Sequence, residues 1–132
     1  MANLGKVLLV DDDEASSFLG VRLLRRMKAA EEIALAGNGH DALILLKKTA
    51  YNLVLLDLNM PVMNGLELLE ALKQLQESKG IAIPIIVVLT SSASAEDRET
   101  AESYSTVKGY LSRPITEDKV NYLIRLVTEG AK

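Results

Sequence analysis

Acidic side chains follow two of the most apolar segments of this chain. Residues 7–10 lead into Asp11, Asp12, Asp13 and Glu14, and residues 53–56 lead into Asp57. Ionised carboxylates are rarely buried unless they are paired or bound to metal, so each should lie where a strand emerges from the core. If the two strands are neighbours in a parallel sheet, their carboxyl ends bring at least three carboxylates to one edge.

A cluster of this kind favours a hard divalent cation. Carboxylates a few ångströms apart repel one another, and a cation relieves that repulsion. Oxygen ligands with room for water suit Mg²⁺, which typically binds one or two carboxylates together with phosphate oxygens. Asp13 and Glu14 are explained more simply as acidic residues at a helix N-terminus. A helix N-terminus explains the presence of Asp11 and Asp12 less well.

Composition excludes several classes of function. The 132 residues fit one domain, and 15 basic against 18 acidic side chains give a net charge of −3, which offers no cationic field for nucleic acid. Cysteine is absent, so disulfides and thiolate chemistry are excluded. The longest apolar run, residues 81–89, is only about half of what a membrane helix needs. No signal peptide is recognisable, and we expect a soluble cytoplasmic protein without membrane contact.

Apolar runs alternate with segments of helical periodicity along the whole chain. The strong runs are residues 7–10, 33–36, 53–56 and 85–89, and a weaker one lies at 109–111. Runs without polar alternation are typical of strands covered on both faces. Five repeats of strand and helix predict an α/β fold, a doubly wound parallel sheet with helices on both faces.

The helical segments differ in how clearly they mark a buried face. In the first, Ala15, Leu19, Leu23 and Met27 predict a core stripe with Leu24 beside it. Phe18 and Val21 fall outside that stripe, and we favour packing at its rim over a partner surface. A second helix is predicted from Asn38-Gly39 onward, with Ala42, Leu43 and Leu46 facing the core. A third is predicted at 65–77, with Leu68, Leu69, Leu72 and Leu75 facing the core, and a fourth at 93–104. The last is predicted at 116–128, where the residues facing the core are Val120, Leu123, Ile124 and Val127.

Two of these helices carry further predictions. Asn64 followed three residues later by Glu67 predicts a capping box at the start of the third helix. The fourth helix, residues 93–104, is polar and should be the least firmly packed. His40, the one histidine, should be an exposed side chain rather than a phosphodonor or a metal ligand.

Several motifs in a fixed order resemble the receiver domain of two-component response regulators, the fold of the chemotaxis receiver. They are Val10-Asp11-Asp12, the stretch from Leu55 to Pro61 with Asn64-Gly65, Leu89-Thr90-Ser91, and Gly109-Tyr110 shortly before Pro114. The resemblance covers essentially the whole chain and implies one receiver domain over residues 1–132. It also implies the strand order 2-1-3-4-5, which is the known order for this fold.

The resemblance implies a phosphorelay function. Asp57 would accept a phosphoryl group from the phosphohistidine of a sensor histidine kinase or histidine phosphotransfer protein. Asp11, Asp12 and Asp57 would hold Mg²⁺ with help from the backbone carbonyl of Asn59. Such a domain catalyses only its own phosphorylation and slow dephosphorylation, and it switches a surface that binds a downstream protein, here unknown.

Three further positions take roles from the resemblance. Thr90 would donate its hydroxyl to the phosphoryl group, and Tyr110 matches the switch aromatic that turns inward as that hydroxyl moves. Arg113 stands where the family has lysine, before a proline that is commonly joined by a cis bond. Arginine keeps the charge and its long stem should still reach the cleft, but its planar fork favours bidentate contacts over a point contact.

Other functions remain open at this stage. One alternative is a receiver that is never phosphorylated and only binds proteins. Arg113 is the only residue that supports it. A Mg²⁺-dependent phosphatase of the haloacid dehalogenase class would use Asp11 and Asp13, but it leaves Asp57 without a role and the chain is short for a substrate cap. A nicotinamide-binding domain is disfavoured because acidic residues follow the first strand in place of a glycine-rich loop.

Overall fold

The computed structural model describes residues 3–60, 62–89 and 95–130. They form five parallel strands in the order β2-β1-β3-β4-β5, which confirms the expected topology. The strands are β1 Lys6–Val10, β2 Glu32–Ala36, β3 Leu53–Asp57, β4 Ile85–Leu89 and β5 Val107–Leu111. The helices are α1 Glu14–Arg26, α2 Gly39–Lys48, α3 Gly65–Lys79, α4 Ala95–Glu102 and α5 Glu117–Gly130.

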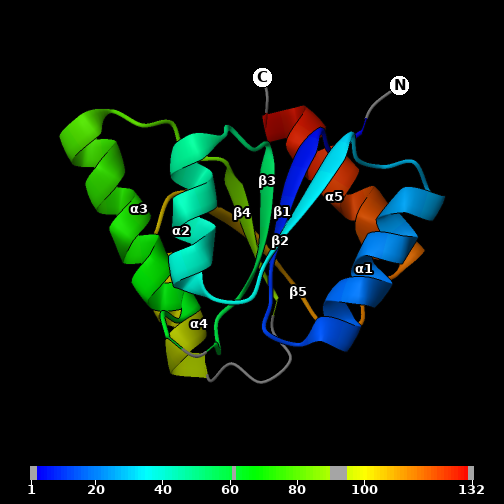
Figure 1. Ribbon diagram of the computed structural model, residues 1–132, viewed down its shortest axis with the longest axis horizontal. Helices are drawn as coiled ribbons and strands as arrows, with labels where there is room; N and C mark the ends of the chain where they lie inside the picture. Colours follow the sequence, from blue (N-terminus) through cyan, green and yellow to red (C-terminus); the bar gives the residue numbers. More distant parts are fainter. Residues whose placement is uncertain (1–2, 61, 90–94, 131–132) are drawn as a thin grey trace.

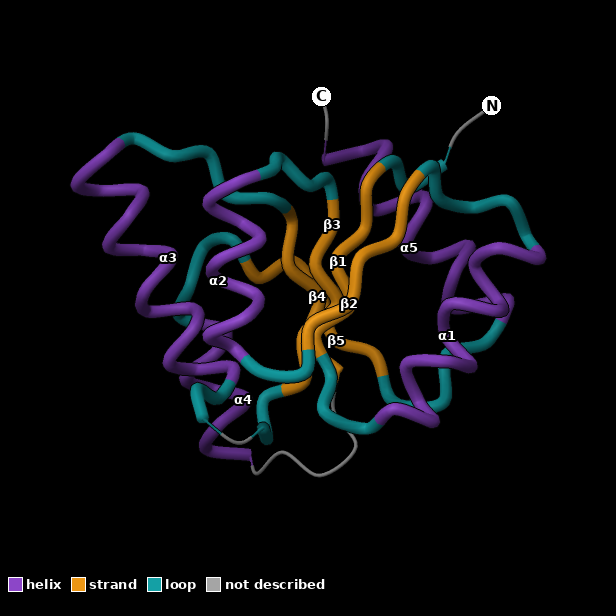
Figure 2. Tube along the Cα trace, viewed as in Figure 1, coloured by secondary structure: helices purple, strands orange, loops and turns teal. Residues whose placement is uncertain are grey.

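The sheet lies between two layers of helices. Helices α1 and α5 cover one face, and α2, α3 and α4 cover the other (Figures 1 and 2). Alternate strand residues supply the two cores: Leu8, Val10, Val54 and Leu56 pack toward α2 and α3, while Val7, Leu9, Leu53 and Leu55 pack toward α1 and α5. All eight are at most 1% exposed, as strands covered on both faces should be.

Strand register places the acidic residues at one edge. Val10 of β1 pairs with Leu56 of β3, so the next residues, Asp11 and Asp57, leave the sheet at the same level. β1 and β3 are neighbours, and β2 lies on the other side of β1, so the connections from β1 and β3 turn to opposite faces. This is the switch point at which open parallel sheets form their clefts.

The predicted core stripe of α1 is wrong in its first half, while Leu24 is buried and Leu23 and Met27 pack against the core as predicted. Ala15 and Leu19 are exposed, with Leu19 at 59%, and the buried residues are Ser17, Gly20 and Leu24. A Cβ at Gly20 would lie 3.4 Å from a methyl carbon of Leu9, so α1 comes close to the sheet through small side chains. The first half of the buried face is therefore marked by the small residues Ser17 and Gly20, and Leu24 continues it.

Other helix predictions fare better. The capping box of Asn64 and Glu67 opens α3 as predicted, and α3 continues to Lys79. Leu68, Leu69 and Leu72 are buried there. In α5, the predicted inward residues Val120 and Leu123 are buried, and Ile124 and Val127 are partly so.

Helix α4 is the shortest of the helices in the described part of the chain. It spans eight residues, Ala95–Glu102, where residues 93–104 were predicted, and residues 93 and 94 lie outside the described ranges. Ala101 is its one buried side chain among those described. None of the helices described is long and apolar enough to cross a membrane.

Candidate functional site

Asp57 is the last residue of β3 and is buried, with 4% of its surface exposed. The strand end is overhung by the start of α3, where the Gly65 N–H donates to the carbonyl of Leu58 at 3.1 Å. A Cβ at Gly65 would lie 2.8 Å from the carbonyl oxygen of Asp57. Glycine is therefore required at this position for α3 to approach so closely.

Asp11 and Asp12 reach the same edge from β1. Asp11 is 4% exposed. Its N–H donates to the Ala36 carbonyl at 3.0 Å, and its Oδ1 accepts from the Asp13 N–H at 2.9 Å. Asp12 is exposed. One carboxylate oxygen of each of Asp11, Asp12 and Asp57 lies within 4.8 Å of the others. The structure thus brings together the three carboxylates that the sequence placed at this edge.

Arg113 supplies positive charge to the cleft. One terminal nitrogen lies 2.9 Å from Oδ2 of Asp57, and Nε lies 3.6 Å from Oδ2 of Asp11. Neither nitrogen has hydrogen-bond geometry with a partner, so the contacts are ion pairs held by charge and position. The expectation that the longer arginine stem reaches the cleft is confirmed, and the Arg113–Pro114 peptide bond is cis as expected.

The protonation of Asp57 is shifted by its surroundings. Burial raises the pKa of the Asp57 carboxyl above its ordinary value, and the charge of Asp11 adds to this effect. The Asn59 N–H, which donates to Oδ1 of Asp57 at 3.1 Å, and the charge of Arg113 oppose it. The net direction is upward, so ionising Asp57 works against the native fold.

The cluster fits a hard divalent cation. All its ligand atoms are carboxylate oxygens, and Oδ2 of Asp11 is buried without a hydrogen-bond partner. A buried carboxylate oxygen that no N–H satisfies is costly unless a cation faces it. Among the described residues, the Arg113 side chain is the cation that faces this oxygen, at 3.6 Å. Mg²⁺ takes such oxygens together with water and phosphate oxygens.

Tyr110, the expected switch aromatic, is half-buried on β5 and is held by α4. Its hydroxyl donates to the carbonyl of Arg98 at 3.2 Å, and the Arg98 guanidinium lies over its ring at 4.7 Å. Burial raises the pKa of the Tyr110 hydroxyl. Thr90 lies outside the described residues. His40 is exposed on α2, as predicted.

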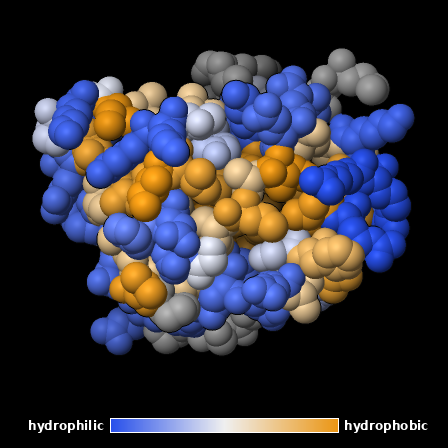
Figure 3. Space-filling view, in the orientation of Figure 1, coloured by the Kyte–Doolittle hydropathy of each residue, from blue (hydrophilic) through white to orange (hydrophobic). Residues whose placement is uncertain are grey.

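A surface groove leads away from the carboxylates along α1. It is lined by Asp11, Asp12, Glu14, Ser17, Phe18, Val21, Arg25, Leu35, Ala36 and Gly37. Phe18 is 59% exposed and Leu35, on the edge strand β2, is 52% exposed. Figure 3 shows apolar side chains over β2 and α1, beside hydrophilic residues. The exposure of Phe18 does not fit the packing at the rim of the core that was favoured for it from the sequence.

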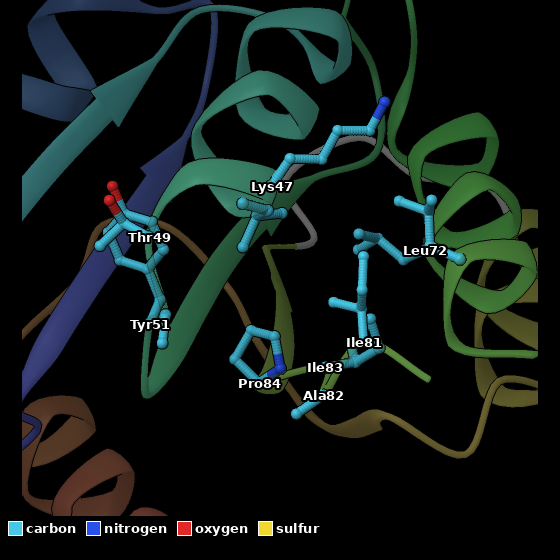
Figure 4. Close-up of a pocket in the computed structure, with 11 residues that line it drawn as sticks. Lys47, Thr49, Tyr51, Leu72, Ile81, Ala82, Ile83 and Pro84 are labelled. Carbon is cyan, nitrogen blue, oxygen red and sulfur yellow. The ribbon is translucent and has the colours of Figure 1, made fainter. Parts of the chain in front are cut away.

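A second hollow lies at the opposite end of the sheet, between α2, α3 and the loop before β4 (Figure 4). Its lining is mostly apolar and includes Tyr51, Leu72, Ile81 and Pro84. It contains no carboxylate, histidine or hydroxyl cluster suited to catalysis, and we assign it no chemistry.

Sequence reasoning missed the contacts made by Lys119, in the first turn of α5. Its ammonium donates to oxygens of Ser112 and Pro114, the residues on either side of Arg113. The amino-acid sequence carries no signal for this contact, since it depends on the path of the loop between β5 and α5.

Comparison with known proteins gives consistent matches. The family model described as the response regulator receiver domain matches residues 7–125. Protein PilH of Pseudomonas aeruginosa is 29% identical over 131 residues, which cover 96% of this chain and all of PilH. The sensor histidine kinase GacS of Pseudomonas protegens is 34% identical over 120 residues, or 90% of this chain. That match spans only 13% of the kinase.

Solved structures agree with the sequence matches. A two-component response regulator from Cytophaga hutchinsonii superposes with a TM-score of 0.81 at 30% identity, covering 96% of this chain and 98% of that one. The receiver domain of Saccharomyces cerevisiae Ssk1, solved with the histidine phosphotransfer protein Ypd1, gives a TM-score of 0.78 at 28% identity, covering 98% of this chain and 90% of that one.

Proposed function

This chain belongs to the response regulator receiver domain family, and on that premise we propose that it accepts a phosphoryl group on Asp57 and so switches a protein-binding surface. Receiver domains are signalling modules of two-component phosphorelays. The observation that carries the proposal is the single edge at which Asp11, Asp12, Asp57 and Arg113 meet. We take residues 1–132 as one receiver domain.

The proposed step is a phosphoryl transfer between two side chains. An Asp57 carboxylate oxygen attacks the phosphorus of a phosphohistidine as the P–N bond breaks, and the electron pair of that bond stays on the imidazole nitrogen. A proton from water then completes the neutral ring. Because negative charge spreads over the phosphoryl oxygens in the transition state, the guanidinium of Arg113 next to Asp57 is placed to stabilise it.

Asp11, Asp12 and Asp57 are the residues that would hold Mg²⁺, with the Asn59 carbonyl as a further ligand. When bound, the ion would offset the charge of the carboxylates and of the phosphoryl oxygens. Asp11 is fixed for this task by its backbone contact to Ala36 and by the N–H of Asp13. The Asn59 N–H orients Asp57 in a similar way.

The phosphodonor is proposed to bind over α1 and β2. The groove there starts at Asp11 and Asp12 and runs past the exposed rings and methyl groups of Phe18 and Leu35. Arg25 and Glu14 line the same groove, so its occupant should present apolar side chains flanked by charges of both signs. The solved complex of Ssk1 with a histidine phosphotransfer protein makes a sensor kinase or such a phosphotransfer protein the natural candidate.

The switching surface is proposed to be the face formed by α4 and β5. Tyr110 links the two elements through its contacts with Arg98. Thr90 would sense the phosphoryl group and Tyr110 would change position in response, altering what this face offers to a downstream protein.

Transfer from a labelled phosphohistidine protein tests the proposal. The native chain with Mg²⁺ should remove the label from the donor and carry it itself, and Asp57→Asn should leave it on the donor. Phe18→Ala should slow transfer from the protein donor while leaving labelling by acetyl phosphate unchanged, because only the protein needs the α1 surface. Labelling of Asp57→Asn at the native rate would refute the assignment, and a receiver that only binds proteins would then be the better reading.

A further inference from the structure

Lys119 holds the loop that carries Arg113. Its Nζ donates to the Ser112 carbonyl at 2.6 Å, to the Ser112 hydroxyl at 3.1 Å and to the Pro114 carbonyl at 2.9 Å. The ammonium has three N–H donors, and three oxygens surround it. Ser112 and Pro114 are exposed, so this contact closes the outer side of a surface loop.

The head of Arg113 is held by two ion pairs rather than by well-aligned hydrogen bonds. Its Nε and one terminal nitrogen are buried without a hydrogen-bond partner, although they face Asp11 and Asp57. Ion pairs fix a distance but constrain direction less than hydrogen bonds do. The orientation of the guanidinium must therefore depend largely on the main chain that carries it, which is the segment from Ser112 to Pro114.

We propose that Lys119 is a positioning residue for the phosphoryl-transfer site, acting through residues 112–114 to direct Arg113 at Asp57. The inference rests on the proposed function, since it takes Arg113 to contact the phosphoryl group. It assigns Lys119 no contact with the phosphoryl group or with the carboxylates. A displacement of about 1 Å at a reacting centre can cost up to roughly a hundredfold in rate, so a loosened loop should have a measurable effect.

Two other roles for Lys119 would give different results. If it only stabilises the fold, its loss would lower the unfolding midpoint and would act independently of Arg113. If its charge acts on the cleft through space, its loss would again act whether or not Arg113 is present. A positioning role predicts that the effect disappears once the arginine side chain has been removed.

The test is a double-mutant cycle on the rate at which acetyl phosphate with Mg²⁺ labels Asp57. Lys119→Met should slow labelling about 5- to 10-fold in the native background. In the Arg113→Ala background, the same substitution should change the rate less than about twofold. An equal effect in both backgrounds, or no effect in the native one, would overturn the proposal.

A direct readout of Arg113 separates this inference from the proposed function. The Nε–Hε signal of Arg113 in ¹⁵N NMR should lie apart from those of exposed arginines in the native chain and should move toward them in Lys119→Met. An unmoved signal would overturn the positioning role. If the native chain takes no label at all, the proposed function fails, and the NMR comparison still decides whether Lys119 directs Arg113.

Matched variants control for charge and for folding. Lys108→Met removes the same charge from an exposed position on β5 and should leave both the rate and the Arg113 signal unchanged. Lys119→Gln, which keeps an N–H donor, is carried through the same cycle so that a folding defect of the Met variant does not decide the outcome. The Gln variant should fall between native and Met, and an effect that persists with Arg113→Ala would again count against the proposal.

Discussion

Helices α3 and α4 lie on the same side of the sheet, yet they are held there differently. Helix α3 begins with a complete capping box and buries Leu68, Leu69 and Leu72 at 2% exposure or less. Among its described side chains, α4 buries only Ala101. Two tyrosine hydroxyls also make hydrogen bonds in and beside this helix. Tyr110 donates to the Arg98 carbonyl, and Tyr104, just past the end of α4, donates to Glu70 of α3 at 2.8 Å.

The difference indicates which helix can move with the smaller loss of free energy. Moving α3 would expose three leucines, each worth about 1.5–3 kcal/mol of burial. Moving α4 would break polar contacts with a net worth of about 0.5–1.5 kcal/mol each. If phosphorylation of Asp57 switches the α4 face as proposed, it would need the free energy of only one or two contacts to move α4, whereas moving α3 would cost much more.

The largest predicted effect tests this contrast through stability. Leu72→Ala should lower the free energy of unfolding by about 2–5 kcal/mol, since the side chain is 2% exposed in the core. Ala101→Gly in α4 should cost about 1 kcal/mol, mainly through helix propensity. Urea denaturation of both variants measures the difference. Similar losses in the two variants would show that α4 is held as firmly as α3.

Much of this frame was predictable from the sequence. The continuous apolar run before Asp57 predicts a strand covered on both faces, and Leu53 to Leu56 are buried as expected. Asn64 and Glu67 predict the start of α3 because a capping box is a local interaction. The gathering of Asp11, Asp12 and Asp57 also follows once β1 and β3 are neighbours, and that order came from the resemblance.

Other features could not be predicted in this way. Helix α1 carries apolar residues on several sides, so periodicity picked the stripe with the most leucine, while the close approach at Gly20 selected the face with small residues. The hydrogen bond from Tyr104 to Glu70 joins two segments that are far apart in the sequence. The hydrogen bond from Lys119 to Pro114 is closer in sequence, but it depends on how the loop before α5 is folded. Such contacts depend on the path of the chain in space, which no local pattern encodes.

A second prediction concerns the charge of Asp57 at the end of β3. The folded-state pKa of Asp57 is raised above its ordinary value of 3.8, mainly by burial, so the native state binds more protons than the unfolded chain above that pH. The free energy of unfolding therefore falls as pH rises through the folded-state pKa. Asp57→Asn should be more stable than the native chain at pH 7 without Mg²⁺, and this advantage should vanish as pH falls toward 3.8.

Urea denaturation at a series of pH values measures that advantage. Glu99→Gln removes an exposed carboxylate of α4 and should change stability by less than about 0.5 kcal/mol at any pH. Added Mg²⁺ should reduce the advantage of Asp57→Asn, because the native cluster would bind the ion more strongly. An Asn variant less stable than the native chain at pH 7 would mean that ion pairing with Arg113 outweighs burial.

The smallest predicted effect concerns the tie between α4 and β5. Arg98→Ala removes the cation above the Tyr110 ring, a contact worth about 0.5–1 kcal/mol at an exposed site. Amide exchange in α4 should speed up while α3 is unchanged. Because Arg98 lowers the pKa of Tyr110, its loss should raise that pKa further, as ultraviolet titration would detect.

Arg22→Ala is the matched control for that variant. Arg22 lies over the ring of Phe18 at 5.9 Å, and both residues belong to α1. Helix α1 covers the face of the sheet opposite to α4. Its removal should leave α4 exchange and the Tyr110 titration unchanged. Equal changes in the two variants would attribute the effect to loss of charge and not to the contact with Tyr110.

The most direct test of the central claim is the intact mass of the chain after incubation with acetyl phosphate and Mg²⁺. We predict the addition of one phosphoryl group in the native chain, its absence in Asp57→Asn, and its loss when a chelator removes the metal. A native chain that gains no mass, or an Asp57→Asn variant that gains the same mass, would contradict the claim that this edge of the sheet is a phosphoryl-accepting site.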